Sequence, residues 1–428
     1  MAVNKTKMSK WPRIRKLIND VHLWMGLSSG LILIVVCFTG TVYVFSTELT
    51  ERAAPHLYKV EAAPGAQPLP VDSLLAKVAA ETGGKVSSVT IPEARNSTYR
   101  FAVKTAADTT PRSGTTYMVN PYTGAIVGNS KEKNGTKAFM STMFSLHRWL
   151  LLDKVKRPII SGVENRKLGS WITGWATILF TLGCITGLVI WFPQKVKYWR
   201  QGLKIKWSAG WKRINHDLHN TLAFYALFFL LLMGLTGPQW SFDWYRNGLQ
   251  KTLGTYKPND KAKGTKEKGT GKDGPMAKQE NKDTVAIAPQ LSIAGLIKKA
   301  DAELSYAGDY TVNLPAKGET NMGISKNKTG FFAPAAGDRI TLNSISGKVE
   351  KKEIFSAKPF NERIAGSIKA LHLGNVYGTF TKILYFIACL IATTLPITGT
   401  LIWINKMKKK PAKRMKPVAA VAQEETQI

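Results

Sequence analysis

The chain has 428 residues, of which 60 are Lys or Arg and 28 are Asp or Glu, so its formal net charge is +32. Such an excess can attract nucleic acid, but the apolar residues here are gathered in four long blocks, which favours a lipid bilayer and no nucleic-acid partner. The three cysteines form no C-x-x-C pair, so neither a disulfide framework nor a thiol-based zinc site is expected.

The four apolar blocks run over residues 21–46, 170–192, 219–240 and 379–404. Each is long enough to cross a hydrocarbon core of about 30 Å as a helix. Basic residues precede the first block, as in a signal peptide. Its apolar core is longer than a signal core of about 7–15 residues, however, and no small-x-small cleavage site follows. The sequence therefore predicts four retained membrane-spanning helices.

The flanking charges predict how these helices are oriented. Residues 1–20 carry six Lys or Arg, the 193–215 connection carries seven and no acid, and the tail after Trp403 carries seven against two Glu. The two long connections are less densely basic and contain many acids. Because basic flanks stay on the cytoplasmic side, both termini and the short connection are expected in the cytoplasm, and the long connections outside.

In chain order, the predicted parts alternate between membrane and water. The first half is a cytoplasmic N-terminus (1–20), a first span (21–46), an exterior α+β domain (47–136), a His-bearing interfacial segment (137–169) and a second span (170–192). A cytoplasmic loop (193–215) leads to the second half. That half is a third span (216–240), an exterior segment with a disordered Lys/Gly-rich linker at 251–283 (241–290), an exterior α+β domain (291–358), a His-bearing segment with the fourth span (359–404) and a cytoplasmic tail (405–428).

An internal repeat relates the two halves. DVHLWMG starts at Asp20 and DLHNTLA at Asp217, and a Thr-Gly follows each histidine after 17–18 residues. ITGLVIW (185–191) matches ITGTLIW (397–403), and the exterior stretch YMVNPYTGAIVG (117–128) resembles ITLNSISGKVEK (340–351). Both copies enter the membrane from the same side, which predicts parallel repeats about an axis along the membrane normal.

Four of the six histidines occupy positions related by this repeat. His22 and His219 begin the first and third spans near the cytoplasmic side, whereas His147 and His372 stand on the exterior side before the second and fourth spans. A single histidine near the end of a span is usually an interfacial polar residue, but two matched pairs indicate function. Neutral imidazoles on opposite helices can bind a haem from both faces. Zinc usually needs three or four converging ligands, so two bis-histidine haems fit better.

Small residues beside the first pair predict room for a flat macrocycle. Gly26 and Gly30 follow His22 at helical spacing, and Ala223 and Ala226 follow His219. The alternative is a close helix–helix contact between small residues.

Other side chains near the pairs could serve as supporting groups. Asp217 could orient His219 or its neighbours, and the unmatched His216 could be an alternative ligand or a partner of a haem propionate. Arg148 could touch a propionate or an exterior substrate, or equally could anchor the chain at the membrane interface, and His56 is expected to be structural or exposed.

The H-x-x-x-G start of the first span, the Thr-Gly near each span end, the LH elements and the two exterior domains together resemble the PepSY-associated transmembrane family, which includes iron-regulated membrane proteins and ferrisiderophore reductases. The resemblance implies a polytopic helical protein of the bacterial inner membrane with two PepSY-like periplasmic domains and two b-type haems. It also implies electron transfer from the cytoplasmic side to a ferric siderophore in the periplasm. The matching ligand positions are His22, His219, His147 and His372.

Iron chemistry gives such a reaction a purpose. Hard oxygen ligands hold Fe(III) tightly and Fe(II) much less so, so one-electron reduction would release the metal. No G-x-G-x-x-G nucleotide fingerprint follows a predicted strand, so the electrons are expected from a separate cytoplasmic reductase or a membrane quinol. The exterior acceptor is expected to meet a haem edge in the cleft between the two exterior domains.

Two other readings stay open at this point. One is a dihaem electron carrier for a different exterior acceptor, such as a copper complex or a redox partner protein. The other is a non-redox protein, either a transporter or a PepSY-type sensor or protease regulator. Transport is disfavoured because the spans lack the acidic residues that coupling ions usually need.

Overall fold

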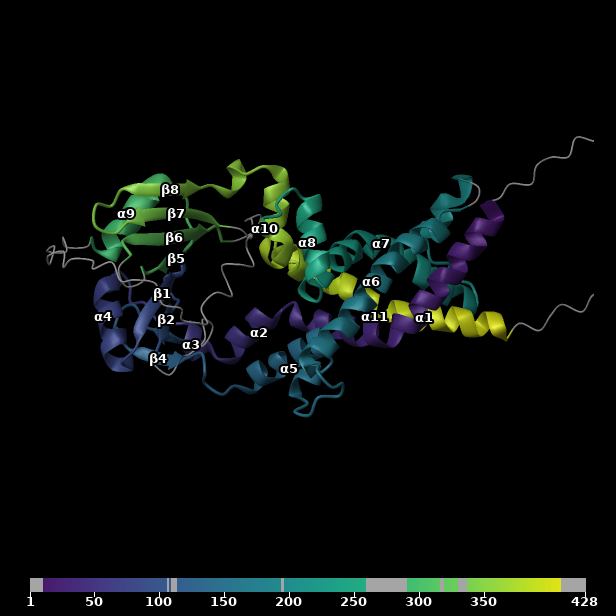
Figure 1. Cartoon of the computed structure of the whole chain (residues 1–428), viewed down its shortest axis with the longest axis horizontal. Helices are drawn as coiled ribbons and strands as arrows, with labels where there is room; N and C mark the ends of the chain where they lie inside the picture. Colours follow the sequence, from purple (N-terminus) through teal and green to yellow (C-terminus); the bar gives the residue numbers. More distant parts are fainter. Residues whose placement is uncertain are drawn as a thin grey trace, which may run out of the picture.

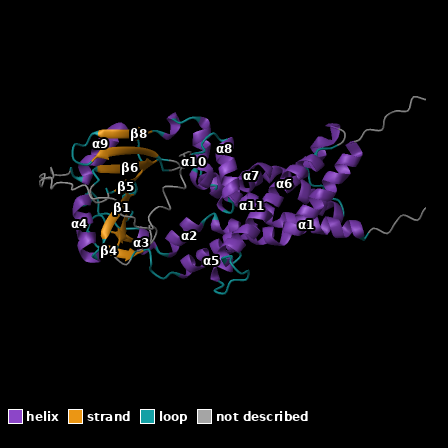
Figure 2. Cartoon of the chain, in the orientation of Figure 1, coloured by secondary structure: helices purple, strands orange, loops and turns teal. Residues whose placement is uncertain are grey.

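The computed structural model describes residues 11–105, 108, 114–193, 196–258, 291–315, 319–329 and 337–408. The predicted tail beyond residue 408, the first ten residues and most of the predicted linker 251–283 lie outside these described residues. Within them, a long helical bundle carries a sheet domain at one end (Figure 1). Figure 2 shows all the strands gathered at that end and the long helices running away from it.

Four long helices form the bundle: α1 (Trp11–Tyr43), α6 (Asn165–Trp191), α7 (Trp211–Thr236) and α11 (Gly378–Met407). Each is long and apolar enough to cross a membrane, counting the 3₁₀ turn η3 (Gly237–Trp240) with α7. Helix α1 begins ten residues before the predicted apolar block. The Arg15 guanidinium donates to the carbonyl oxygen of Ile190 at 2.7 Å, near the end of α6, where helix carbonyls lack partners within their own helix.

Shorter helices connect the bundle to the sheet domain. They are α2 (Ser46–Ala53), α3 (Pro55–Tyr58), α5 (Gly135–Trp149), α8 (Asp243–Thr252) and α10 (Phe360–Leu373), with 3₁₀ turns η1 (Leu152–Lys154), η2 (Val196–Leu203) and η4 (Phe355–Ala357). The Asn134 side chain caps α5 by accepting from the backbone N–H groups of Thr136 and Lys137. Helices α5 and α10 lie between the sheet and the bundle (Figure 1).

The sheet domain contains eight antiparallel strands in the order β4-β3-β2-β1-β5-β6-β7-β8. The first half of the chain supplies β1 (Lys85–Ile91), β2 (Tyr99–Lys104), β3 (Thr115–Val119) and β4 (Ile126–Asn129). The second half supplies β5 (Asp309–Asn313), β6 (Asn321–Asn327), β7 (Asp338–Asn343) and β8 (Val349–Glu353). Helices α4 (Val71–Thr82) and α9 (Ile293–Glu303) cover one face, with Leu74, Val78 and Leu296 at most 1% exposed.

The two exterior segments predicted as separate domains therefore share one sheet. They join through β1 and β5, whose pairing leaves neither strand as an exposed edge. Val89 pairs with Val312, and the offset that relates these two residues also relates Tyr117 to Ile340, the first residues of the matching stretches. Val89 thus pairs with the residue that the predicted repeat assigns to it, as strands do across a two-fold axis. No cleft separates the two halves of the sheet.

Candidate functional site

The structure brings together the histidines that the sequence pairs. His22 of α1 and His219 of α7 have ring centroids 6.4 Å apart, with ring planes inclined at 83°. His147 of α5 and His372 of α10 have centroids 6.3 Å apart, with planes inclined at 60°. We call His147 and His372 the sheet-proximal pair, because α5 and α10 lie beside the sheet domain, and His22 and His219 the sheet-distal pair (Figure 1).

Each of these four histidines lies against a Thr-Gly dipeptide of a neighbouring helix, which we call its Thr-Gly seat. The seats are Thr186-Gly187 for His22, Thr398-Gly399 for His219, Thr39-Gly40 for His147 and Thr236-Gly237 for His372. A Cβ added at any of the four glycines would lie 3.2–3.4 Å from the Cε1 atom of its histidine. Glycine suits these positions because the Cε1 edge of the imidazole approaches the helix too closely for a side chain to fit without a shift.

Hydrogen bonds at Nδ1 hold the rings of the sheet-distal pair. Nδ1 of His22 lies 3.1 Å from the carbonyl oxygen of Gly183 and 3.0 Å from Oγ1 of Thr186. Nδ1 of His219 lies 2.9 Å from Oγ1 of Thr398. The Thr398 hydroxyl donates its own hydrogen to the carbonyl oxygen of Thr394 at 3.0 Å, so its oxygen is left to accept from the imidazole N–H.

The sheet-proximal pair follows the same pattern. Nδ1 of His147 donates to the carbonyl oxygen of Val36 at 2.9 Å, and Nδ1 of His372 donates to Oγ1 of Thr236 at 3.0 Å. The Thr236 hydroxyl donates to the carbonyl oxygen of Leu232 at 2.6 Å. Burial lowers the pKa of His147 and lowers that of His372 to about 3, so both rings are neutral near pH 7.

This bonding places the proton on Nδ1 and leaves the lone pair on Nε2 of each ring, which is how a metal-binding histidine is usually prepared. An imidazole nitrogen binds a first-row metal at about 2.0–2.1 Å and lies about 1.1 Å from its ring centroid, so two opposed imidazoles on one metal have centroids about 6.3 Å apart. The observed separations of 6.4 and 6.3 Å equal this value within 0.1 Å.

The described residues contain no group of three or more His, Cys, Asp or Glu side chains placed to hold a metal ion. A zinc site would need such a group, because zinc normally takes three or four protein ligands. Each pair brings together two imidazoles, so a metal bound between them would take its remaining ligands from outside the described side chains.

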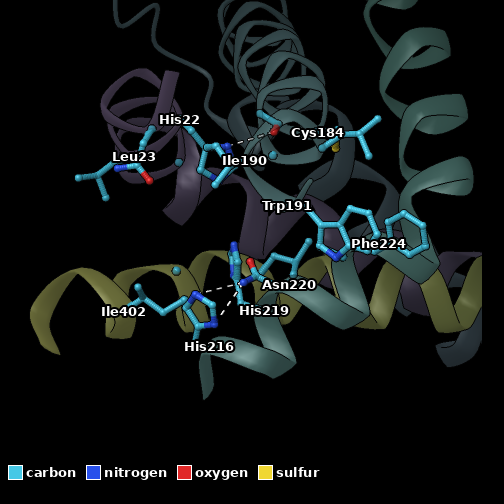
Figure 3. A pocket seen from close by; sticks show the side chains of 18 of the residues that line it. His22, Leu23, Cys184, Ile190, Trp191, His216, His219, Asn220, Phe224 and Ile402 are labelled. Carbon is cyan, nitrogen blue, oxygen red and sulfur yellow. Dashed lines mark hydrogen bonds between the residues drawn. The ribbon is translucent and has the colours of Figure 1, made fainter. Parts of the chain in front are cut away.

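A cavity of about 550 Å³ adjoins the sheet-distal pair (Figure 3). All four long helices contribute to its lining, and the Trp191 and Phe224 rings stack beside it with centroids 4.0 Å apart. The volume lies within the range of about 300–1,000 Å³ that is typical of ligand and cofactor sites.

Gly26 lines this cavity, and a Cβ added there would meet nothing within 4 Å. Gly30, in contrast, packs against Pro396 of α11, where an added Cβ would lie 3.2 Å from the proline Cβ. Ala223 lines the cavity, whereas Ala226 is buried in a cluster of apolar side chains in the bundle. Both roles predicted from the sequence are therefore present. Gly26 and Ala223 leave space in the cavity, whereas Gly30 and Ala226 allow close packing of the helices.

This arrangement occurs in a chain that matches a known protein family over nearly its whole length. Residues 20–406 match the profile described as the PepSY-associated TM region. The chain belongs to this family. With its four long apolar helices, this PepSY-associated protein is a membrane protein. No curated protein matches the chain.

The groups around His219 in this PepSY-associated protein agree with the sequence-based expectation in part, since Oδ1 of Asp217 lies 3.6 Å from Nδ1 of the neighbouring His216. The Asp217 carboxylate accepts from Nε of Arg213 at 2.7 Å and from the backbone N–H of Lys206 at 3.2 Å, so it anchors the turn before α7. Thr398 orients the His219 ring instead. His216 is half-exposed, lines the cavity and lies within hydrogen-bonding distance of Nδ2 of Asn220, at 3.2 Å (Figure 3).

Arg148, next to His147 in α5, donates through Nη2 to the carbonyl oxygen of Trp240 at 3.2 Å. Trp240 in turn places its ring 4.9 Å from that of His372, centroid to centroid. His56 is exposed, and its Nε2 atom lies 3.0 Å from Oε1 of Glu132. It belongs to neither histidine pair, as expected for a surface residue. The Thr-Gly motifs were visible in the sequence, but only the structure shows which histidine each one holds.

Proposed function

We propose that this PepSY-associated protein is a dihaem reductase of the bacterial inner membrane that delivers electrons to a ferric siderophore in the periplasm. The observation that carries the proposal is the 6.3–6.4 Å separation within both histidine pairs. It supports one metal ion between each pair of imidazoles, with a macrocycle supplying the other four ligands.

Several features of the chain support haem rather than a bare metal ion. The cavity beside the sheet-distal pair has the volume of a cofactor site, and Gly26 opens it next to His22. The three cysteines do not form the C-x-x-C-H pattern of covalent haem attachment, which favours b-type haem. When bound, a haem at each pair would carry one electron at a time between ferric and ferrous iron.

The protein's own part is to seat, orient and separate the two centres. The Thr-Gly seats fix the imidazoles, and the apolar helices exclude water around them. His22 and the seat that holds His147 stand 18 residues apart on α1, which corresponds to about 27 Å along a helix. The two sites would therefore lie near opposite surfaces of the membrane, and the macrocycle edges would shorten the gap between them.

The direction of electron flow rests on the basic flanks. They favour cytoplasmic termini and a periplasmic sheet domain, so the sheet-distal pair would receive electrons from a cytoplasmic reductase or a membrane quinol. Protease added from the periplasmic side should cut within residues 251–283 and leave the tail after Lys406 intact. Cleavage of that tail from the periplasm would reverse the proposed direction.

The proposed reaction transfers one electron from the sheet-proximal centre to Fe(III) held by the siderophore. Oxygen ligands bind the resulting Fe(II) more weakly, so the iron leaves while the chelator stays intact. Because the two halves of the sheet join without a cleft between them, the chelate would approach from beside α5 and α10.

The test uses the purified full-length protein. We expect about two haems per chain, low-spin spectra and, after chemical reduction, reoxidation by a ferric siderophore with Fe(II) trapped by a ferrous chelator. The variant His372→Ala should lose this reaction, and His56→Ala should keep it. Absence of haem would refute the proposal. Reoxidation by a copper complex or a redox protein but not by ferric siderophores would instead indicate an electron carrier for another acceptor.

A further inference from the structure

A partly exposed indole contacts the sheet-proximal pair. Trp240 lies three residues after Gly237 of the His372 seat, is 40% exposed, and has its ring centroid 4.9 Å from that of His372. The residue at the same position after the His147 seat is Tyr43, whose ring packs on Phe144 at 5.3 Å. Among the ring contacts of the described residues, Tyr43 meets no histidine. The two sides of the sheet-proximal pair are therefore unequal.

Exposed aromatic residues near the end of a spanning helix commonly anchor the protein at the membrane interface. Trp175 and Trp244 fit that role, since they are 53% and 58% exposed and pack on each other and on Phe242. Trp240 is distinguished from them by its contact with His372 and by the Arg148 guanidinium on its backbone carbonyl.

Two guanidinium groups lie against the Trp149 ring, and one of them, that of Arg148, also reaches the Trp240 carbonyl. The Arg166 guanidinium lies 4.2 Å from the centroid of the Trp149 ring, and that of Arg148 lies 6.0 Å from the same centroid. Neither arginine belongs to an ion pair among the residues that the structure describes.

Two carboxylates, those of Asp153 and Glu164, line the same hollow as Arg166, but neither forms an ion pair with it among the described residues. Arg166 stands in the first turn of α6, where the helix dipole adds positive potential. Asp153, in the loop between α5 and α6, accepts from the Ser145 hydroxyl and pairs with Lys154 at 3.8 Å. The Glu164 side chain makes no cap hydrogen bond to α6. Arginine forks bind carboxylate and other anionic oxygens in pairs, so this cluster is suited to an anion.

We propose that Trp240 is the electron exit of the sheet-proximal site and that Arg148 and Arg166 bind an acceptor of net negative charge, such as a ferric carboxylate or catecholate chelate. This inference rests on the proposed function and specifies its substrate class. In the step itself, one electron passes to the ferric ion of the chelate, which becomes ferrous. No covalent bond forms or breaks, and no proton is transferred.

The experiment compares two acceptors of similar reduction potential and opposite charge, ferric EDTA and hexaammineruthenium(III). Chemically reduced protein is mixed with each in a stopped-flow spectrometer, and reoxidation of the haem is followed at low and high salt. We expect the anionic acceptor to react faster at low salt, with the advantage fading as salt screens the arginines. In the double variant Arg148→Gln/Arg166→Gln, the rate with ferric EDTA should fall about tenfold while that with the ruthenium complex does not fall.

The role of Trp240 is tested separately. Trp240→Leu should slow both acceptors by a similar factor, Trp240→Phe should retain most of the rate, and the control Trp244→Leu should change neither. Haem content and the low-spin spectrum should be unchanged in all of these variants. The reduction potential of the sheet-proximal haem is an independent measurement. It should be lower in Arg148→Gln, because a nearby cation favours the ferrous state.

Three results would overturn the inference while leaving the reductase proposal intact. The first is an unchanged preference for the anionic acceptor in the arginine variants. The second is loss of the sheet-proximal haem from the arginine variants, which would assign the arginines to haem propionates. The third is an unchanged reoxidation rate in Trp240→Leu. A protein without haem, or one that reduces neither acceptor, would instead refute the proposed function together with this inference.

Discussion

The Thr-Gly seats give the sharpest test of how the histidines are held. Gly187 on α6 faces His22, and a Cβ added there would lie 3.2 Å from Cε1 of the ring. Carbon atoms in favourable contact are about 3.5–4.0 Å apart, so Gly187→Ala must push the ring by at least about 0.3 Å. Ligand distances in metal sites tolerate only about 0.2 Å. The alanine variant should therefore keep the sheet-distal haem with altered axial ligation.

A larger side chain at the same position should be decisive. Gly187→Leu adds three further carbons where the imidazole now packs, and overpacking of this kind typically costs about 1–3 kcal/mol. That corresponds to about 5- to 150-fold weaker haem retention, since about 1.4 kcal/mol is a factor of ten. Gly183→Ala is the matched control on the same helix, because an added Cβ there meets nothing within 4 Å.

Haem-to-protein ratio, electron paramagnetic resonance and the reduction potentials of both centres are the measurements. We expect Gly187→Leu to lose one haem of two, Gly187→Ala to shift the signal of one centre, and Gly183→Ala to match the unchanged protein. If Gly187→Leu retained two haems with unaltered low-spin signals, His22 would not bind iron from this seat. The 6.4 Å ring spacing of this pair would then not reflect a metal between His22 and His219.

Three further predictions address the ligands, the cavity and the bundle. His219→Ala should remove one haem and leave the centre at His372 able to accept electrons from dithionite; retention of two low-spin haems would contradict the pairing. Gly26→Leu should fill the cavity and lower haem content to about one per chain without loss of thermal stability, and an unchanged haem ratio would show that the cavity is not the cofactor site. Glu48→Gln should lower the free energy of unfolding by about 1–3 kcal/mol, because the Lys382 side chain is 11% exposed and pairs with this carboxylate at 2.6 Å. An unaltered melting temperature would show that the ion pair contributes nothing to the stability of the fold.

The positions of the spans could be predicted from the sequence because apolar length alone decides whether a helix crosses a bilayer. The histidine partners were predictable as well. The matching sequence stretches predict that His22 lies beside His219 and His147 beside His372, and the rings of each pair lie close together in the structure. The start of α1 at Trp11 was missed, because basic residues interrupt its first turns and the continuous apolar block begins only after them.

What the sequence did not reveal are contacts between distant segments. Thr398 holds His219 from another helix, 179 positions along the chain. No local sequence pattern indicates that Thr398, rather than the neighbouring Asp217, orients the ring. The pairing of β1 with β5 likewise joins segments more than 200 residues apart, as Val89 and Val312 show. Such contacts follow from how whole elements pack, which periodicity along one element does not record.

The two-fold relation through Val89 and Val312 has a consequence for how such a molecule can be assembled. Each half of the chain holds two seated histidines but only one member of each pair, and its strand β1 or β5 would be a bare edge if the other half were missing. A half-length chain would have to associate with a second copy of itself to complete both histidine pairs and cover the strand edge, as in an isologous homodimer. In that dimer both sides would be identical. Joining the copies in one polypeptide is what lets Trp240 on one side differ from Tyr43 on the other, so that only one side need serve as an exit.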